Sequence, residues 1–478
     1  MNYRNIIFTL GWVLNIEAVC MILPMVCSLV YREDTFSVYL ISALICLAVG
    51  FLCTFRQPKN KSMYAREGFV TVALSWIVLS VFGTMPFVFS GGIPNFIDAL
   101  FETVSGFTTT GSTILTDIES LPKSLLFWRS FTHWIGGMGV LVFLVAIVPL
   151  HGGKNMHLLR AESTGAEVTK LVPKVKSSAM ILYGIYTGLT VLQIILLLAG
   201  GMSFYDAVTT SFSTAGTGGF SANNDSLVSY SPYIQHVVTV FMIIFGIDFS
   251  VYFLILMRKF KIGFRSEEVR KYLLIILLAT LVICYDCRGL YASVSENITH
   301  SAFQVASIIT TTGFMTTDYV QWPALSQTIL VLLMFIGSCA GSTGGGIKVS
   351  RIIILIKSVF KEIKICAHPN TVYKVKLSGR TVEHETMRSI NVFFVSYIAI
   401  YVVSLLCVSL DNYDFTTNFS SIATMMNNVG PGLNLVGPTQ NFSFFSPFSK
   451  LVFVFDMLAG RLEIFPMLML FSRHTWRR

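Results

Sequence analysis

Apolar runs of about twenty residues recur along the whole chain, and they constrain its fold more than any other feature. A helix needs roughly twenty such residues to cross the hydrocarbon core of a bilayer. The 478 residues are 54% hydrophobic and only 12% charged, a balance that no soluble domain of this size needs. We predict an all-α polytopic membrane protein with ten spans, at residues 6–30, 37–55, 69–90, 127–150, 178–200, 234–257, 271–287, 326–357, 389–410 and 449–472.

The net charge of +9 comes from lysines and arginines that gather in alternate loops. They follow the second, fourth, sixth and eighth spans and end the chain, so the positive-inside rule predicts that both termini are cytoplasmic. This distribution over separate loops does not indicate a nucleic-acid partner. The basic loops 151–177 and 258–271 are candidates to contact a cytosolic subunit, and anionic lipid headgroups explain the same charges equally well.

Four short apolar segments between the spans end in a glycine that follows hydroxyl or amide residues. We name their last three residues the tail segments: Thr109-Thr110-Gly111, Thr217-Gly218-Gly219, Thr311-Thr312-Gly313 and Asn428-Val429-Gly430. The four glycines are spaced by 108, 94 and 117 residues, which indicates a repeat of spanning helix, half-helix with tail, and spanning helix. We therefore predict two N-terminal helices in 1–66 and four pseudo-fourfold repeats at 67–155, 176–260, 270–362 and 388–474.

Three aspartates precede the tail segments, each separated from its tail by about the length of a short helix. Asp98 and Asp206 each lie thirteen residues before the tail glycine, His300 lies at the same interval in the third repeat, and Asp414 stands one helical turn further away. An aspartate at the start of a short helix accepts hydrogen bonds from its free amides. We expect these aspartates to be N-caps rather than ion ligands, with the negative helix ends directed at the tails.

Non-helical backbone survives at membrane depth only when it is buried in protein or lines a watery path. Backbone carbonyls from four tail segments can replace the hydration shell of a cation, and glycine permits the positive φ that directs those carbonyls inward. Any one tail alone would indicate an ordinary loop or a packing face. Four in register predict a pore lined by the twelve tail residues, with no side-chain charge required.

Six motifs resemble those of the TrkH/KtrB potassium-transporter superfamily, in its TrkH branch. They cover essentially the whole chain, at 105–111, 133–139, 310–313, 341–346, 428–432 and 460–463. The resemblance implies potassium as the substrate, no cofactor in this chain, and no enzymatic activity. It implies a multi-pass protein of the bacterial inner membrane, surrounded by lipid, that forms a homodimer regulated by a cytosolic ring of TrkA-like subunits binding NAD or ATP.

The third inner helix is interrupted by Gly337–Gly346, so it should break halfway through the membrane. The resemblance implies that this glycine-rich loop is an intramembrane gate below the filter, formed by Gly341, Ser342, Thr343, Gly344, Gly345, Gly346 and Lys348. A phosphate-binding loop is excluded because Ile347 stands where that motif requires lysine. A helix-packing role for the glycines remains open.

Arg461 lies mid-way along the fourth predicted inner helix, where a buried arginine implies a task or a partner. We hypothesise that it is an electrostatic valve beside the glycine-rich loop. The alternative is a structural ion pair with Asp456, Glu463 or Asp248. Asp248 occupies a position where the resembled family would have asparagine, and its role is undecided.

Gly136, Gly137 and Gly139 in the first predicted inner helix are expected to permit close helix packing. His133 is expected to be an interfacial residue beside Trp134.

Two other functional classes compete with the pore. A symporter built on an inverted repeat would show two related halves instead of four similar segments, although proton- or sodium-coupled potassium transport stays open as the alternative. A membrane enzyme would need paired catalytic groups at one depth, and the sequence offers no such constellation.

Overall fold

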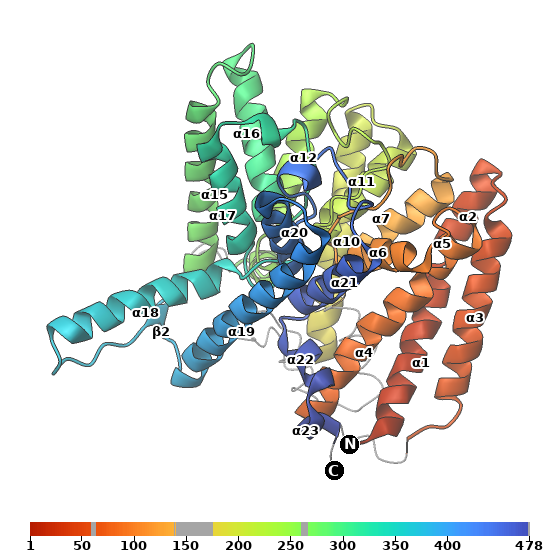
Figure 1. Cartoon of the computed structure of the whole chain (residues 1–478), viewed down its shortest axis with the longest axis horizontal. Coiled ribbons are helices and arrows are strands. Elements are labelled where there is room, and N and C mark those ends of the chain that lie inside the picture. The colour runs from red at the N-terminus through yellow and green to blue at the C-terminus, as the bar shows by residue number, and fades with distance from the viewer. Residues whose placement is uncertain (59–63, 138, 140–174, 260–265, 477–478) are drawn as a thin grey trace.

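The computed structural model is largely helical and describes residues 1–478 except 59–63, 138, 140–174, 260–265 and 477–478 (Figure 1). The first predicted span consists of two successive helices that together form one membrane-length stretch, and the second predicted span packs against it on one side of the molecule. This N-terminal group also contacts the first outer and inner helices of the repeats. Its elements are α1 (Tyr3–Cys20), α2 (Ile22–Tyr31) and α3 (Phe36–Thr54).

Each of the four repeats pairs a long outer helix with a short pore helix. The outer helices are α4 (Ala65–Gly83, continued by α5, Met85–Phe89), α10 (Val175–Ala199), α15 (Glu267–Asp286) and α19 (His384–Val408). The pore helices are α6 (Phe96–Phe107), α11 (Phe204–Gly216), α16 (Val294–Ile309) and α20 (Phe415–Asn427).

The inner helices close the four repeats into a ring. Each one packs against the pore helix of the following repeat, and α21 of the last repeat packs against α6 of the first. The inner helices are α7 (Lys123–Gly137), α12 (Pro232–Phe245) with α13 (Phe249–Leu256), α17 (Ala324–Ile336) with α18 (Val349–Ala367), and α21 (Pro447–Arg461) with α22 (Phe465–Phe471). The predicted all-α, pseudo-fourfold fold is confirmed.

The inner helices are more interrupted than the sequence indicated. The predicted break at Gly337–Gly346 is confirmed, but the prediction of continuous spans at 234–257 and 449–472 is wrong. The first of these bends by 92° between α12 and α13, and the second breaks where Glu463 and Ile464 take positive φ angles of 55° and 69°. The end of span 127–150 lies outside the described residues.

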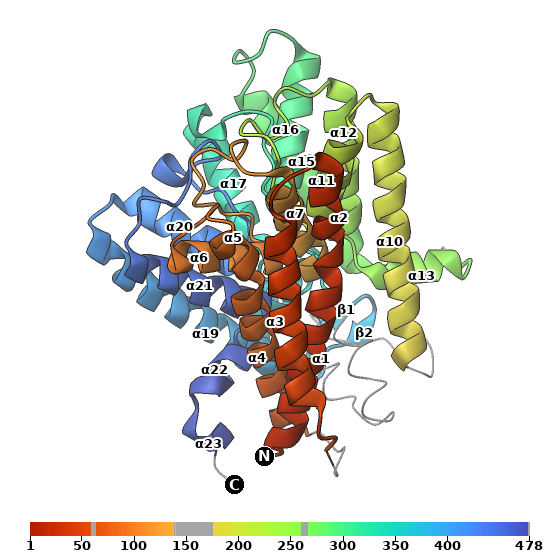
Figure 2. The ribbon, with the colours of Figure 1, turned by 90° about the vertical axis from the view of Figure 1, so that its right-hand side faces the viewer.

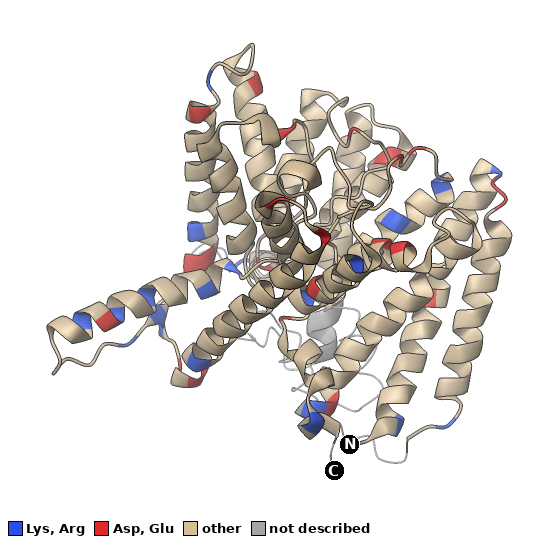
Figure 3. Cartoon of the chain, viewed as in Figure 1, with Lys and Arg blue, Asp and Glu red and all other residues tan. Residues whose placement is uncertain are grey.

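Five helices in the described part of the chain are long and apolar enough to cross a membrane unbroken, and the bent pair would make a sixth. Helices such as α3 expose large apolar side chains, among them Ile41, Leu44 and Phe51, which are 52–62% exposed. Such faces suit lipid contact rather than water. Figure 3 shows lysines and arginines along α18 and at α23.

The two ends of the chain meet on the same side of the molecule (Figures 1 and 2). The rings of Tyr3 and Trp476 stack with their centroids 6.4 Å apart. Few elements remain: a hairpin of β1 (Lys376–Leu377) and β2 (Arg380–Thr381), helix α23 (Arg473–Trp476), and the 3₁₀ turns η1 (Tyr319–Gln321), η2 (Ser409–Asp411) and η3 (Asn434–Val436).

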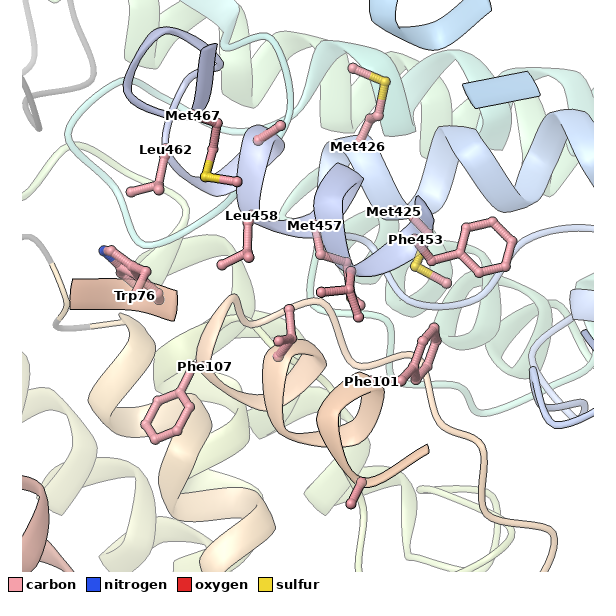
Figure 4. Packing of buried hydrophobic residues seen from close by; sticks show 14 of the residues in the cluster. Trp76, Phe101, Phe107, Met425, Met426, Phe453, Met457, Leu458, Leu462 and Met467 are labelled. Atoms are coloured by element: carbon pink, nitrogen blue, oxygen red, sulfur yellow. The ribbon is translucent and has the colours of Figure 1, made fainter. Parts of the chain in front are cut away.

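The largest apolar cluster joins the first and fourth repeats. Figure 4 shows Phe101 of α6 near Phe453 of α21, and their ring centroids lie 6.3 Å apart in an edge-on arrangement. Met457 and Leu458 extend the contact along α21. All four side chains are buried, so the junction that closes the ring is a packed core.

Candidate functional site

The four tail segments share one backbone conformation. In each, the first residue is left-handed, with φ of 56° at Thr109, 54° at Thr217, 57° at Thr311 and 54° at Asn428. Two residues later the glycine again has positive φ: 81° at Gly111, 78° at Gly219, 83° at Gly313 and 101° at Gly430. A non-glycine residue rarely adopts such angles, so their fourfold recurrence identifies equivalent positions.

The tail segments also touch one another in a ring. A side chain added at Gly111 would collide with the carbonyl oxygen of Gly218, and one at Gly219 with that of Thr312. The same relation continues from the third tail to the fourth, and it closes with Gly430 beside the carbonyl oxygen of Thr110, 2.8 Å from an added Cβ. All twelve predicted tail residues therefore meet at one place, where each tail approaches the backbone of the next.

The pore helices begin with N-caps, but only one predicted aspartate is a cap. Asp414 accepts from the amide of Thr417 at 3.0 Å, and its hydrogen bonds with Thr417 lower the pKa of the Asp414 carboxyl. The predictions for Asp98 and Asp206 were wrong, because Asn95 and Ser203 take the cap positions. An acid three residues after a cap still faces the free amides of the first turn, which is why the two positions look alike in sequence.

This corrects the spacing of the repeats as well. Measured from the true N-cap, the tail glycine follows sixteen residues later in the first, second and fourth repeats. The third pore helix begins after Ser293 and is the longest of the four at 16 residues. The extra turn therefore belongs to the third repeat rather than to the fourth, and His300 lies inside that helix.

Side-chain hydrogen bonds hold the tail segments in place. Ser105 donates to the carbonyl of Ser112 at 2.6 Å, and in the third repeat Ser307 donates to the carbonyl of Phe314 at the same distance. The fourth tail is tied to the first, since the side-chain amide of Asn428 donates to Thr110 Oγ1 at 2.9 Å. Ser112 in turn donates to the carbonyl of Gly430 at 2.9 Å, so these bonds fix the tails to one another and to the segments that follow them.

An ion pair that the sequence analysis missed supports the first two tails. Arg129 Nε lies 2.6 Å from Glu102 Oε1, and both side chains are buried. Glu102 also accepts from the amide of Ile114 at 3.0 Å, and Arg129 Nη1 donates to the carbonyl of Ser221 at 2.9 Å. The signal was present, because a charged residue in an apolar segment of a membrane protein calls for a partner.

His133 is not the interfacial residue we expected. It is fully buried, its ring stacks on Phe220 at 4.1 Å, and its Nδ1 accepts from the Phe220 amide at 3.4 Å. Phe220 directly follows the second tail, so His133 supports that tail from the first inner helix. The neighbouring Gly136 and Gly137 permit close packing as predicted, since added side chains would strike Phe107 and Gly216, and one at Gly139 would strike Trp76.

The glycine-rich loop contacts the third and fourth tails. The amide of Gly345 donates to Thr311 Oγ1 at 2.7 Å, and the amide of Gly346 donates to the carbonyl of Asn427 at 3.1 Å. A side chain at Gly344 would lie 2.8 Å from the carbonyl oxygen of Thr310, and one at Gly345 would strike the carbonyl of Asn427. The loop therefore lies against the ring, and its glycines are required for that approach.

Two cations lie beside this loop. Lys348 is 4% exposed, has a φ of 84° and donates through Nζ to the carbonyl of Gly344. Arg461 does not lie mid-helix as predicted but is the last residue of α21. Its guanidinium donates to the carbonyls of Thr343 and Gly136, both at 2.7 Å. Arg461 thus connects the loop to the first inner helix.

The three acids that could have paired with Arg461 are engaged elsewhere. Glu463 binds Arg351 at 2.6 Å, and Asp456 accepts from Ser404 at 2.7 Å. Asp248 is the N-cap of α13 and accepts from the amide of Ser250 at 2.8 Å. The undecided role of Asp248 thus has a structural answer, because an N-cap is needed where α12 bends into α13.

The fold, with its long apolar helices, defines a class: a multi-pass membrane transport protein. Comparison with known proteins gives the family. The model of the TrkH family of cation transport proteins matches residues 36–477, and the chain belongs to this family.

Named relatives match over their whole length. The chain is 37% identical to the Trk system potassium uptake protein TrkH of Escherichia coli, with 100% of both chains covered. It is 33% identical to the TrkG protein of the same organism, covering 100% of this chain and 99% of the other. The crystal structure of the potassium transporter TrkH from Vibrio parahaemolyticus superposes with a TM-score of 0.90 over 100% of both chains, at 33% identity.

Proposed function

We propose that this protein takes up potassium across the bacterial inner membrane through the ring of tail segments, which acts as a selectivity filter. The observation that carries the proposal is the ring itself: four backbone segments with the same alternation of positive φ, each glycine seated against the carbonyl of the next tail. The names of the full-length relatives, all potassium uptake proteins, support the choice of ion.

The chemistry of the ring favours a monovalent cation. Carbonyl oxygens can replace the hydration shell of potassium without a formal charge. Divalent cations are usually held by carboxylates, and none of the twelve tail residues carries one. The carboxyl ends of four pore helices directed at the ring add partial negative charge, which would repel anions and attract the ion from solution.

The glycine-rich loop is proposed as the gate, and Arg461 as its electrostatic valve. The loop lies against the third and fourth tails, and Arg461 donates to the carbonyl of Thr343 within it. Lys348 adds a second positive charge to the same loop, since its Nζ donates to the carbonyl of Gly344. A cation leaving the ring would meet both charges, so conduction requires the loop to shift together with its contacts.

The proposal also covers the oligomeric state and the regulatory partner. We expect a homodimer with both termini in the cytoplasm, which agrees with the contact between Tyr3 and Trp476. A cytosolic TrkA-like subunit that binds NAD or ATP would act on the gate from that side. Of the two basic loops predicted to contact it, residues 151–174 and 260–265 lie outside the described residues.

One experiment tests the central claim. The purified chain alone is placed in proteoliposomes, and uptake of potassium, rubidium, sodium and choline is compared at equal gradients. We expect potassium and rubidium to enter faster than sodium, and choline to be excluded. Equal sodium and potassium uptake would contradict the selectivity of the ring, and the absence of all cation flux would contradict the pore.

A further inference from the structure

One carboxylate reaches both sides of the glycine-rich loop. Glu268, in the first turn of α15, accepts from the amide of Ala340 at 2.7 Å and from the amide of Ser350 at 3.1 Å. Both bonds go to the same oxygen, Oε1. Ala340 precedes the three consecutive glycines of the loop and Ser350 follows them, so a side chain from another helix spans the loop.

The second of these hydrogen bonds supplies an acceptor for a free backbone amide at the start of α18. The first amides of a helix have no partner within the helix, and the N-cap of α18, Lys348, supplies no capping side chain. Ser350 is the second residue of α18, and Glu268 accepts from its amide in place of a local cap. A carboxylate is also the charge that a helix N-terminus favours.

The position of Glu268 is itself fixed by its neighbour. Glu267 Oε1 accepts from Lys357 of α18 at 2.6 Å, and Oε2 accepts from the amide of Ser378 in the turn of the β1–β2 hairpin at 3.1 Å. The amide of Glu267 in turn donates to Ser378 Oγ at 3.0 Å. The first turn of α15 is therefore anchored to α18 on one side of Glu268 while Glu268 itself holds the loop.

We propose that Glu268 is the positioning residue of the gate: it holds the glycine-rich loop against the ring from outside the ion path. The inference rests on the proposed role of that loop. Loss of the Oε1 acceptor would free Ala340 and the start of α18 together, so the loop would leave its resting position more often. A glutamine keeps an oxygen acceptor at the same place and should preserve most of the hold.

A native thiol reports the position of the loop. Cys339, next to Ala340, is a free and fully buried cysteine. Cys287, equally buried, lies just beyond the opposite end of α15 and serves as a control for general loosening. Labelling of both by N-ethylmaleimide is quantified by peptide mass spectrometry in the full chain in proteoliposomes, alongside potassium and sodium uptake.

In Glu268→Ala we expect Cys339 labelling and potassium uptake to rise at least about fivefold, since two hydrogen bonds are lost. Cys287 labelling and the potassium-to-sodium ratio should not change. Glu268→Gln should give less than half of that rise. The matched control is Glu362→Ala, which removes a carboxylate that is 66% exposed and lies on α18, away from the loop; it should leave every reading unchanged.

The outcomes separate this inference from the proposed function. Unchanged Cys339 labelling in Glu268→Ala, or an equal rise at Cys287, would overturn the role of Glu268. A glutamine variant as strongly affected as the alanine variant would overturn the part assigned to the acceptor oxygen. A selective rise in Cys339 labelling without any change in uptake would uphold Glu268 as the holder of the loop and overturn the loop as gate.

Discussion

Arg129 and Glu102 form a buried ion pair, 2.6 Å between Nε and Oε1, that ties the backbone after the first tail to the backbone after the second. Each partner alone would be a buried, uncompensated charge. Their bonds to Ile114 and Ser221 make the pair a brace between neighbouring quarters of the ring.

Removing one partner of this pair should be strongly destabilising. We expect Glu102→Ala to lower the free energy of unfolding by about 3–5 kcal/mol, the usual effect of breaking a buried pair, as measured by thermal unfolding in detergent. The double variant Glu102→Leu/Arg129→Met should be less affected than Glu102→Ala. A single variant as stable as the parent protein would show that the pair braces nothing.

Substitution of the tail glycines should reduce selective uptake. The reduction should be larger where the added Cβ lies closer to a neighbouring carbonyl. Gly111→Ala places a Cβ against the carbonyl of Gly218 at a φ of 81°. Gly430→Ala should be milder, since its nearest neighbour is 2.8 Å from the added Cβ. The matched control is Gly91→Ala, which has a φ of 73° and nothing within 4 Å.

The Gly91 control carries the cost of positive φ, about 1–2 kcal/mol, without any contact in the ring. Rubidium uptake with sodium competition measures all three variants. Equal losses in Gly91→Ala and Gly111→Ala would mean that backbone strain, and not the ring, is responsible.

Replacement of Arg461 should increase uptake. Arg461→Ala removes a positive charge and two hydrogen bonds, to Thr343 and Gly136, and we expect rubidium uptake in whole cells to rise several-fold. Arg461→Lys keeps the charge but not the fork that reaches two carbonyls, and should give a smaller rise. Arg473→Ala, at an exposed arginine in α23, is the control. Unchanged uptake in Arg461→Ala would end the valve hypothesis.

Asp248 should tolerate asparagine but not alanine. An asparagine side chain at this position would still accept from the amide of Ser250 and cap α13, so Asp248→Asn is expected to keep the stability and flux of the parent protein. Asp248→Ala removes the cap and should cost about 1 kcal/mol, seen as a lower thermal unfolding midpoint. A marked loss of flux in the asparagine variant at normal stability would instead assign the charge a role in conduction.

The sequence predicted the ring better than the helices around it. Gly111 and its three counterparts stood out because four similar segments recur along the chain, and the break at Gly337 followed from a glycine run. The break after Arg461 was missed, since Glu463 and Ile464 take positive φ without any residue that favours it. Only packing against other repeats can impose such angles.

The burial of His133 was missed for a related reason. Its partner, Phe220, is far away in the chain, and the stack depends on an inner helix packing against the next repeat. The caps were misassigned by three residues because Ser203 and Asp206 are both good helix starters. Local chemistry thus located the elements, whereas the contacts between repeats had to come from the structure.

The closure of the ring within one polypeptide has a genetic consequence. In an assembly of four identical subunits, a codon change would alter every quarter at once. Here a mutation at Gly430 leaves Gly111, Gly219 and Gly313 untouched, so each quarter can vary alone. The sequence differences among the tails, from Thr-Thr-Gly to Asn-Val-Gly, are the kind of independent adjustment that such a single-gene ring permits.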